Sequence, residues 1–452
     1  MLLAEALSWS LFAFIVFILV GSRARALDKV FTIIIVTMPI LAPSVASQVF
    51  LRGNIYRLIS VVIVLVLTLR FDSLWKTVAN LWFVRLYLAF LVVCLISAMV
   101  SVEPVESVFR SLTYLEPLFY FFLAFVVAHE FPKGFEVGNK AIFTSLVMAL
   151  AYGVFQIITQ SDPLLEIGFR NHMTTTLFNV NYLEDKRTFS GRITSVFGQP
   201  VYAAFFFIAT SHVLFYKFIT ARRGHFFHLA LVFILLLAIF TTGTRAAYVV
   251  IALVLFLVML HHGLRSLKFV FSVAIVVLLF VGVVLQDETV EYVRRSFDLS
   301  RADEFNANAF QRLALTGRLL ELALESPSLG LGPGYVQKAA TGTLTSYNPG
   351  FEGLGGQENH FFVILADTGV VGTVVYLMFL WTWFASLKRV NRGISSSLDT
   401  YRSLLLIVLF CFFLGSFTVA NLVSVPMIFL FVSYGLYVGK VAQNSEIELS
   451  GR

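Results

Sequence analysis

The sequence predicts an all-α, polytopic membrane protein with about 12 to 13 transmembrane helices and one large polar loop before the last of them. Of its 452 residues, 58% are hydrophobic and only 13% are charged. Soluble domains carry about 25% charged residues, so this composition argues against an ordinary soluble protein. Apolar runs of near-spanning length recur along the chain. We therefore expect a single membrane domain over residues 1–452.

The apolar runs define the expected helices. The first is interpreted as a helix, because no basic segment and small-residue cleavage site mark it as a signal peptide. The runs at 57–69 and 247–261 are short for a span and require tilting or extension. The runs lie at about 7–20, 30–49, 57–69, 81–100, 112–128, 141–158, 200–219, 226–242, 247–261, 267–285, 361–387, 403–420 and 423–438.

Lys and Arg residues gather in alternate loops, which predicts that these loops face the cytoplasm. The net charge of +7 is explained by these loops and does not predict a nucleic-acid partner. The two long loops, about 159–199 and 286–360, then face the periplasm. Thirteen spans place the N-terminus outside, whereas twelve spans, with the first run lying in the interface, place both termini in the cytoplasm.

The loop at 286–360 has a helical pattern of its own, which is typical of a functional loop. Residues 288–299 and 310–324 both predict amphipathic helices, the second with Phe310, Leu313, Leu320 and Leu324 at helical spacing. Ser326-Pro327 is expected to end the second helix. A glycine-rich turn with Gly332, Gly334 and Tyr335 follows. We expect this loop to form a lid and half of an active site.

Three arginines on the predicted outer side are candidate anion ligands. Arg192 precedes a polar turn and a proline at a helix start, which suits an anion site, although an interfacial arginine is equally expected there. Arg245 lies in a tight outer turn, against the charge trend; the alternative is a side chain that snorkels to the surface. Arg318 precedes the glycine-rich turn, which by itself indicates only a turn and is not a Walker loop.

The segment Glu358-Asn359-His360 closes the large loop. Asn359 suits the N-cap of the helix that follows. Glu358 or His360 is a candidate general base. The alternative is that Glu358 only complements the helix dipole and that His360 is interfacial. Neither a CxxC pair nor a DxD-like pair predicts a metal site, so no metal and no cofactor are expected.

Four blocks between about residues 191 and 376 together resemble the O-antigen ligase and O-antigen polymerase superfamily of bacterial envelope glycosyltransferases. Arg192 through Ala203 looks like its Arg…Thr-Ser-x-Phe-Gly-Asn-Pro-Asn…Ala block, with Gln199 and Val201 at the two Asn positions. Thr244 through Tyr248 looks like its Ser-Arg-Gly-Ala-Trp block.

The other two blocks belong to the lid. Arg318 through Tyr335 looks like the family's Arg…Pro-x-x-Gly-x-Gly-x-Gly-Phe/Tyr stretch, without the usual Trp after the Arg. Glu358 through Gly372 looks like its His-Asn-x-Phe/Tyr-Leu…Ala-Glu-x-Gly-Leu-x-Gly block, with Glu358 at the position of the ligase-type His. Glutamate at this position is more typical of the polymerase-like and exopolysaccharide members, so Glu358 is the first candidate base and His360 the second.

The resemblance implies an undecaprenyl (polyprenyl) diphosphate-linked glycan as donor and a multi-pass enzyme of the bacterial inner membrane that acts at the periplasmic face. Its implied partners are the lipid-linked donor, a glycan or lipid A-core acceptor, membrane lipids and a chain-length regulator. Arg192, Arg245 and Arg318 are the implied diphosphate ligands. A polymerase of surface polysaccharide, O-antigen or exopolysaccharide, is the first expectation. A ligase that moves the glycan to lipid A-core (lipopolysaccharide synthesis) or to another acceptor, and a lipid-linked glycan flippase, remain alternatives.

Overall fold

The computed structural model describes part of the chain, and every regular element in that part is helical, as the sequence predicts. The described residues are 72–115, helical positions within 118–126, 134–159, 161–163, 193, 195, 200–220, 225–262, 316–336, 360–389 and 396–416. The labelled helices are α4(Asp72–Ala79), α5(Trp82–Met99), α6(Pro104–Thr113), α8(Gly134–Thr159), α11(Pro200–Thr220), α12(His225–Thr241), α13(Arg245–His262), α18(His360–Arg389) and α19(Ser396–Ser416).

Several of these helices coincide with predicted spans. Helices α5, α8, α11 and α18 are long and apolar enough to cross a membrane, and α12 and α13 contain shorter apolar helices. These helices make the chain a multi-pass membrane protein. Five predicted runs, at 7–20, 30–49, 57–69, 267–285 and 423–438, lie outside the described residues, as does the predicted helix at 288–299.

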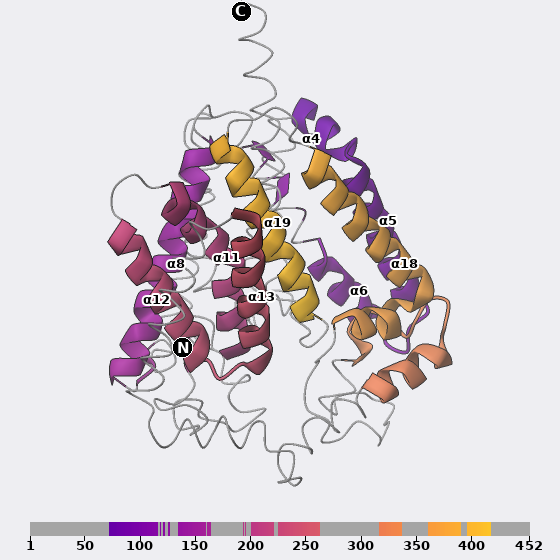
Figure 1. Cartoon of the computed structure of the whole chain (residues 1–452). Helices are drawn as coiled ribbons and strands as arrows, with labels where there is room; N and C mark the ends of the chain where they lie inside the picture. Colours follow the sequence, from indigo (N-terminus) through magenta and orange to yellow (C-terminus); the bar gives the residue numbers. More distant parts are fainter. Residues whose placement is uncertain are drawn as a thin grey trace, which may run out of the picture.

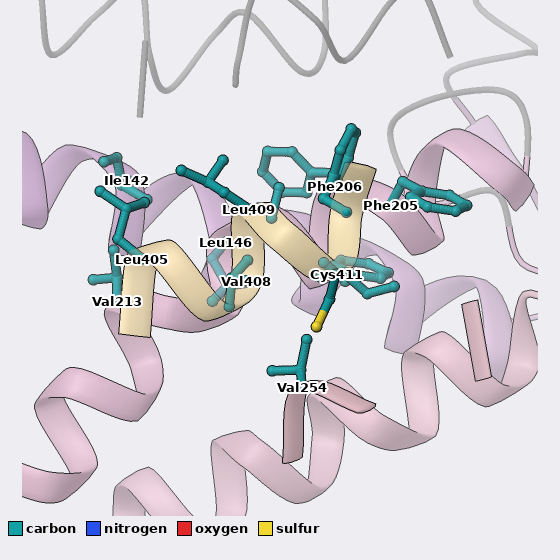
Figure 2. Close-up of a cluster of buried hydrophobic side chains, with 14 of the residues drawn as sticks. Ile142, Leu146, Phe205, Phe206, Val213, Val254, Leu405, Val408, Leu409 and Cys411 are labelled. Carbon is teal, nitrogen blue, oxygen red and sulfur yellow. The ribbon is translucent and has the colours of Figure 1, made fainter. Parts of the chain in front are cut away.

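Helix α11 is the most buried of the four long helices, with 72% of its apolar window inside the protein. It packs against α8, α12 and α19, and α19 also packs against α13. Apolar side chains from these helices interdigitate at native density, which holds the helices in one arrangement. Figure 2 shows where they meet: Ile142 and Leu146 from α8, Phe205, Phe206 and Val213 from α11, Val254 from α13, and Leu405, Val408, Leu409 and Cys411 from α19.

Helices α5 and α18 form a second unit, in which they run side by side (Figure 1). Their contact is an aromatic seam. The ring centroids of Tyr87 and Phe379 are 4.9 Å apart, and those of Phe90 and Tyr376 are 5.1 Å apart. Tilted aromatic pairs at such distances add attraction beyond the burial of their area. This seam fixes the position of α18, which carries the end of the large loop.

A buried polar contact joins α11 to α19. The Nε2 of His212 lies 3.1 Å from the Tyr401 hydroxyl, and its Nδ1 lies 2.7 Å from the Ala209 carbonyl oxygen. Both ring nitrogens of this fully buried histidine therefore have partners. Polar groups inside a membrane helix need such partners, because lipid supplies none. His212 thus ties two helices together within the bundle.

The predicted cytoplasmic and outer segments lie at opposite ends of the bundle (Figure 1). Helix α4, which carries Lys76, lies at the upper end in this view. The described part of the large loop, drawn in orange, lies at the lower end with α6. The alternation of charged loops therefore agrees with how the helices are arranged.

Gly415 of α19 lies against α11 and α13, and this contact generates a first prediction. A Cβ at Gly415 would lie 2.5 Å from the Phe205 ring and 3.0 Å from Val250. Gly415→Ala is therefore expected to lower the free energy of unfolding by about 1–3 kcal/mol through overpacking. Thermal unfolding in detergent measures this, with Gly317→Ala as the control.

A Cβ at Gly317 would meet no atom within 4 Å, and Gly317 lies in a helix, where alanine is favoured. The control variant is therefore expected to unfold at or above the temperature of the wild type. Equal melting temperatures for Gly415→Ala and the wild type would contradict the described packing of α19 on α11.

Candidate active site

Helix α18 is broken at Gly369, which has φ 67° and ψ −171°. The sequence predicted one uninterrupted apolar helix here, so the break is a correction. It leaves carbonyl and N–H groups around residues 366–371 without helical partners. Inside a membrane protein such groups are tolerated only where other protein groups satisfy them. Something must therefore pack against the break.

The glycine-rich turn, residues 326–336, supplies those partners. It donates two backbone hydrogen bonds to the first segment of α18 and accepts two from the second. The bonds are Leu331 N–H to Ala366 O (2.9 Å), Gly332 N–H to Asp367 O (2.9 Å), Val370 N–H to Pro327 O (2.8 Å) and Val371 N–H to Ser328 O (3.2 Å). The turn and the break therefore form one hydrogen-bonded unit.

Glycine is required where the two backbones touch. Gly330 has φ 72°, and a Cβ there would lie 2.5 Å from the Asp367 carbonyl carbon and the Thr368 nitrogen. A Cβ at Gly369 would overlap the backbone of Ser328. Both glycines adopt a positive φ, which other residues rarely do. The predicted need for unusual backbone geometry in this turn is confirmed.

Asp367 joins the turn through its side chain as well. Its carboxylate accepts the Gly334 N–H at 2.9 Å and the Val336 N–H at 3.3 Å. Its carbonyl oxygen also accepts the Ser97 hydroxyl of α5 at 2.8 Å. The residue is 2% exposed. Our sequence analysis missed Asp367, although a carboxylate inside an apolar run is the kind of signal that marks a functional position.

Helix α6 forms a wall beside the turn, and it too was missed. Arg110 pairs with Glu106 (Nε to Oε1, 3.4 Å), and its side chain packs against Gly334, whose added Cβ would lie 2.7 Å from the Arg110 Cγ. Pro104 at the first turn, with Glu106 early and Arg110 late, is the sequence signal for this short helix. A shallow pocket between α6 and the turn is lined by Glu103, Glu106, Ser107, Leu331, Pro333, Gly334 and Tyr335.

The predicted second amphipathic helix is described over residues 316–325 and is helical there, ending before Ser326-Pro327 as expected. We call residues 316–325 the lid helix. Its buried face carries Leu319 and Leu322, which pack in a small cluster with Val363 of α18. Leu320 and Leu324, members of the predicted stripe, face outward with 41% and 76% exposure. The face that packs on the protein is therefore a different one.

Arg318 lies on the lid helix and forms an ion pair with Glu321, with 2.5 Å between Nη1 and Oε2. Its side chain is 30% exposed. The pair is local to the helix, at i and i+3. The described contacts therefore place Arg318 on the lid and do not bring it to the segments of Arg192 or Arg245.

The segments of the other two arginines do meet. The Ile193 N–H donates to the Thr241 carbonyl at 3.1 Å. Ile193 directly follows Arg192, and Thr241 is the last residue of α12, ahead of the turn that leads to Arg245. Arg192 and the side chain of Arg245 lie outside the described residues. The structure thus joins the two neighbouring backbones.

Ser195 fixes this junction to α8. Its N–H donates to the Gln156 side-chain oxygen at 2.8 Å, and its hydroxyl donates to the Ala149 carbonyl at 2.6 Å. Ser195 has φ 47°, an uncommon value for a residue other than glycine. Such a conformation persists only where surrounding contacts hold it, and it often marks a functional segment.

His360 is the first residue of α18, which begins where the sequence predicted. It is 4% exposed, and its Nε2 lies 3.2 Å from the Tyr376 hydroxyl. Its ring also packs on Tyr376 and Phe361. Its Nδ1 has no hydrogen-bond partner among the described residues. Glu358 and Asn359 lie outside the described residues, so the predicted N-cap stays a prediction.

Together, the helical bundle and the glycine-rich turn docked at its outer end define a multi-pass membrane protein with a candidate site at that end. Residues 230–377 match the family model described as O-Antigen ligase. This match confirms the resemblance to the O-antigen ligase and polymerase superfamily, and with it a membrane glycosyltransferase type of activity. No curated protein matches the chain. The matched region includes Arg245, the lid helix, the glycine-rich turn and the break in α18.

The docking of the turn generates a second prediction. Gly369→Ala forces a positive φ on alanine and overlaps the backbone of Ser328, so the turn is expected to leave the break. Hydrogen–deuterium exchange should then show faster exchange of the Leu331, Gly332, Val370 and Val371 amides. Gly317→Ala, the same change on the same lid, is the control and should leave these amides protected. Unchanged protection in Gly369→Ala would contradict the described contact.

Proposed function

We propose that this protein is a polymerase of surface polysaccharide that joins glycan repeat units carried on undecaprenyl diphosphate. In this proposal it acts at the periplasmic face of the bacterial inner membrane. The acceptor and donor are both glycans at the membrane–water boundary. The proposal refines the membrane glycosyltransferase activity that the family match supports.

The proposed reaction needs one base and a cationic site for the leaving group. The acceptor hydroxyl oxygen attacks the anomeric carbon of the donor and forms the new C–O bond. The bond from that carbon to the diphosphate oxygen breaks, and the lipid diphosphate leaves with the electron pair. The acceptor proton passes to the Glu358 carboxylate. Attack opposite the diphosphate inverts the anomeric configuration.

Arginines suit the leaving group, because guanidinium groups bind phosphate oxygens in a bidentate manner and stabilise charge that grows in the transition state. We assign this role first to Arg192 and Arg245, and third to Arg318. The observation that carries the proposal is the hydrogen bond from Ile193 to Thr241, which brings the backbones next to Arg192 and Arg245 together. It supports a shared anion site, which single interfacial arginines would not require.

The surroundings of His360 support Glu358 as the first candidate base. The imidazole is buried against Tyr376 and Phe361, and its Nε2 is engaged by the Tyr376 hydroxyl. These contacts suit a residue that anchors the start of α18. Glu358 precedes the helix by two positions and belongs to the segment that returns from the lid. His360 remains the second candidate, through its Nδ1.

A ligase is the second candidate function, because the matched family model is itself described as O-Antigen ligase. A ligase would transfer the finished glycan to lipid A-core or another acceptor. In that case His360 would gain weight as the base. A lipid-linked glycan flippase is the third candidate, and it predicts a different fate for the donor when Arg245 is replaced.

Glu358→Gln is expected to abolish polymerisation, because the amide cannot accept the acceptor proton while the shape is retained. The measurement is a reconstituted reaction with purified protein and a lipid diphosphate-linked repeat unit as the only glycan. The wild type should produce a ladder of longer lipid-linked products. Glu325→Gln, the same change at an exposed lid carboxylate, is the control and should keep the ladder.

Two outcomes would contradict the polymerase assignment. A ladder from Glu358→Gln at the wild-type rate would remove Glu358 as the base. No ladder from the wild type, with transfer once lipid A-core is added, would make the protein a ligase.

Arg245→Ala is expected to lower transfer by about 10²–10³-fold, the usual cost of losing one preorganised group that stabilises transition-state charge. In cells, lipid-linked donor should then accumulate on the periplasmic leaflet. Arg245→Lys keeps the charge without the bidentate geometry, so partial activity is expected. Accumulation on the cytoplasmic leaflet would instead indicate a flippase.

A further inference from the structure

Asp367 is a buried carboxylate in an otherwise apolar helix, two residues before the break at Gly369. Burying a carboxylate in such surroundings is unfavourable unless strong hydrogen bonds compensate. An apolar residue would avoid this cost. The contacts of the side chain therefore indicate what the residue contributes.

The carboxylate is not needed to satisfy the broken helix. The freed carbonyls of Ala366 and Asp367 already accept the Leu331 and Gly332 N–H groups. The described hydrogen bonds of the carboxylate go further along the turn, to the Gly334 and Val336 N–H groups. Bonds from N–H groups to an ionised acceptor are stronger than neutral ones. Asp367 therefore holds the end of the turn, beyond the part that the break itself binds.

Val336 marks the point where the chain leaves the turn. Its side chain is buried in the cluster with Leu319, Leu322 and Val363, which joins the turn, the lid helix and α18. The next described residue is His360, at the start of α18. Asp367 and His360 are about two helical turns apart on the same rigid segment. The chain between Val336 and His360 thus starts and ends on one short piece of helix.

Glu358 belongs to that returning chain, two residues before His360. Holding both ends of a loop lowers the number of conformations that it samples. Catalysis depends on such positioning, because a displacement of about 1 Å costs roughly 100-fold in rate. A bond that fixes one end of the loop therefore affects the chemistry without touching the substrate.

We propose that Asp367 is a positioning residue whose carboxylate holds the Gly334–Val336 end of the glycine-rich turn on α18 and thereby sets the placement of Glu358. This inference rests on the proposed function. It assigns Asp367 no contact with donor or acceptor. It also explains why a carboxylate occupies a helix in which apolar residues would otherwise be favoured.

Asp367→Asn provides the test in full-length protein in lipid nanodiscs. The amide has nearly the same shape, but its NH₂ group faces one of the two N–H donors and repels it. We expect kcat to fall about 100-fold with KM little changed. Exchange at the Gly334 and Val336 amides should rise while the melting temperature changes little. Asp367→Glu keeps two acceptor oxygens and is expected to recover part of kcat.

Ser97→Ala is the matched control. It removes the hydroxyl bond to the Asp367 carbonyl and leaves the carboxylate in place. It is expected to lower the melting temperature slightly and to keep kcat. If Ser97→Ala and Asp367→Asn lose kcat equally for an equal loss of melting temperature, the role is merely structural and the inference is overturned.

The exchange measurement separates this inference from the proposed function. A wild type without transfer would count against the proposed function, and the exchange at Gly334 and Val336 then decides the role of the carboxylate. Unchanged protection of those amides in Asp367→Asn would overturn the inference even where polymerisation is established.

Discussion

The break in α18 is the constraint on which the outer end of the molecule depends. A membrane helix cannot leave backbone groups unpaired, because hydrocarbon offers no hydrogen bonds. The positive φ at Gly369 creates such groups, and the turn at 326–336 satisfies four of them. The approach is so close that a Cβ at Gly330 or Gly369 would collide with the opposite backbone. The break therefore specifies where the lid packs.

A second anchored junction lies on the other side of the bundle. Ile193 and Ser195 tie the end of the first outer loop to α12 and α8. The aromatic seam holds α5 and α18 together, and α19 lies between this unit and the helices around α11 (Figure 1). Rigid helices that present irregular segments at one end are the arrangement that a site for positioned chemistry needs. In the proposed function, one junction holds the leaving group and the other holds the base.

The fold class was predictable from the sequence because membrane helices obey strong compositional rules. Length and hydropathy alone identified α5, α8, α11 and α18, and the loop charges separated the two ends. The break at Gly369 was not predictable in this way, since the residues around it are apolar and continue the run. It depends on a tertiary contact with the turn, which no local pattern encodes.

The candidate site was predictable in part. The glycines of the turn and the start of α18 at His360 were identified from residue type, because positive φ and helix starts have local signals. Asp367 and α6 were missed, although a carboxylate in an apolar run and a proline-led short helix were both visible. The outward face of the lid helix was also mistaken for its main apolar face, because Leu319 and Leu322 are buried only through contact with α18.

The measurement that tests the central claim most directly is a cryo-electron microscopy structure with a non-hydrolysable lipid diphosphate-linked sugar bound. The account predicts the diphosphate between the guanidinium groups of Arg192 and Arg245, at the end of the bundle where the glycine-rich turn packs on α18. The anomeric carbon should face Glu358 across the space for an acceptor hydroxyl. A diphosphate bound at the opposite end, beside α4, or away from both arginines, would contradict the account.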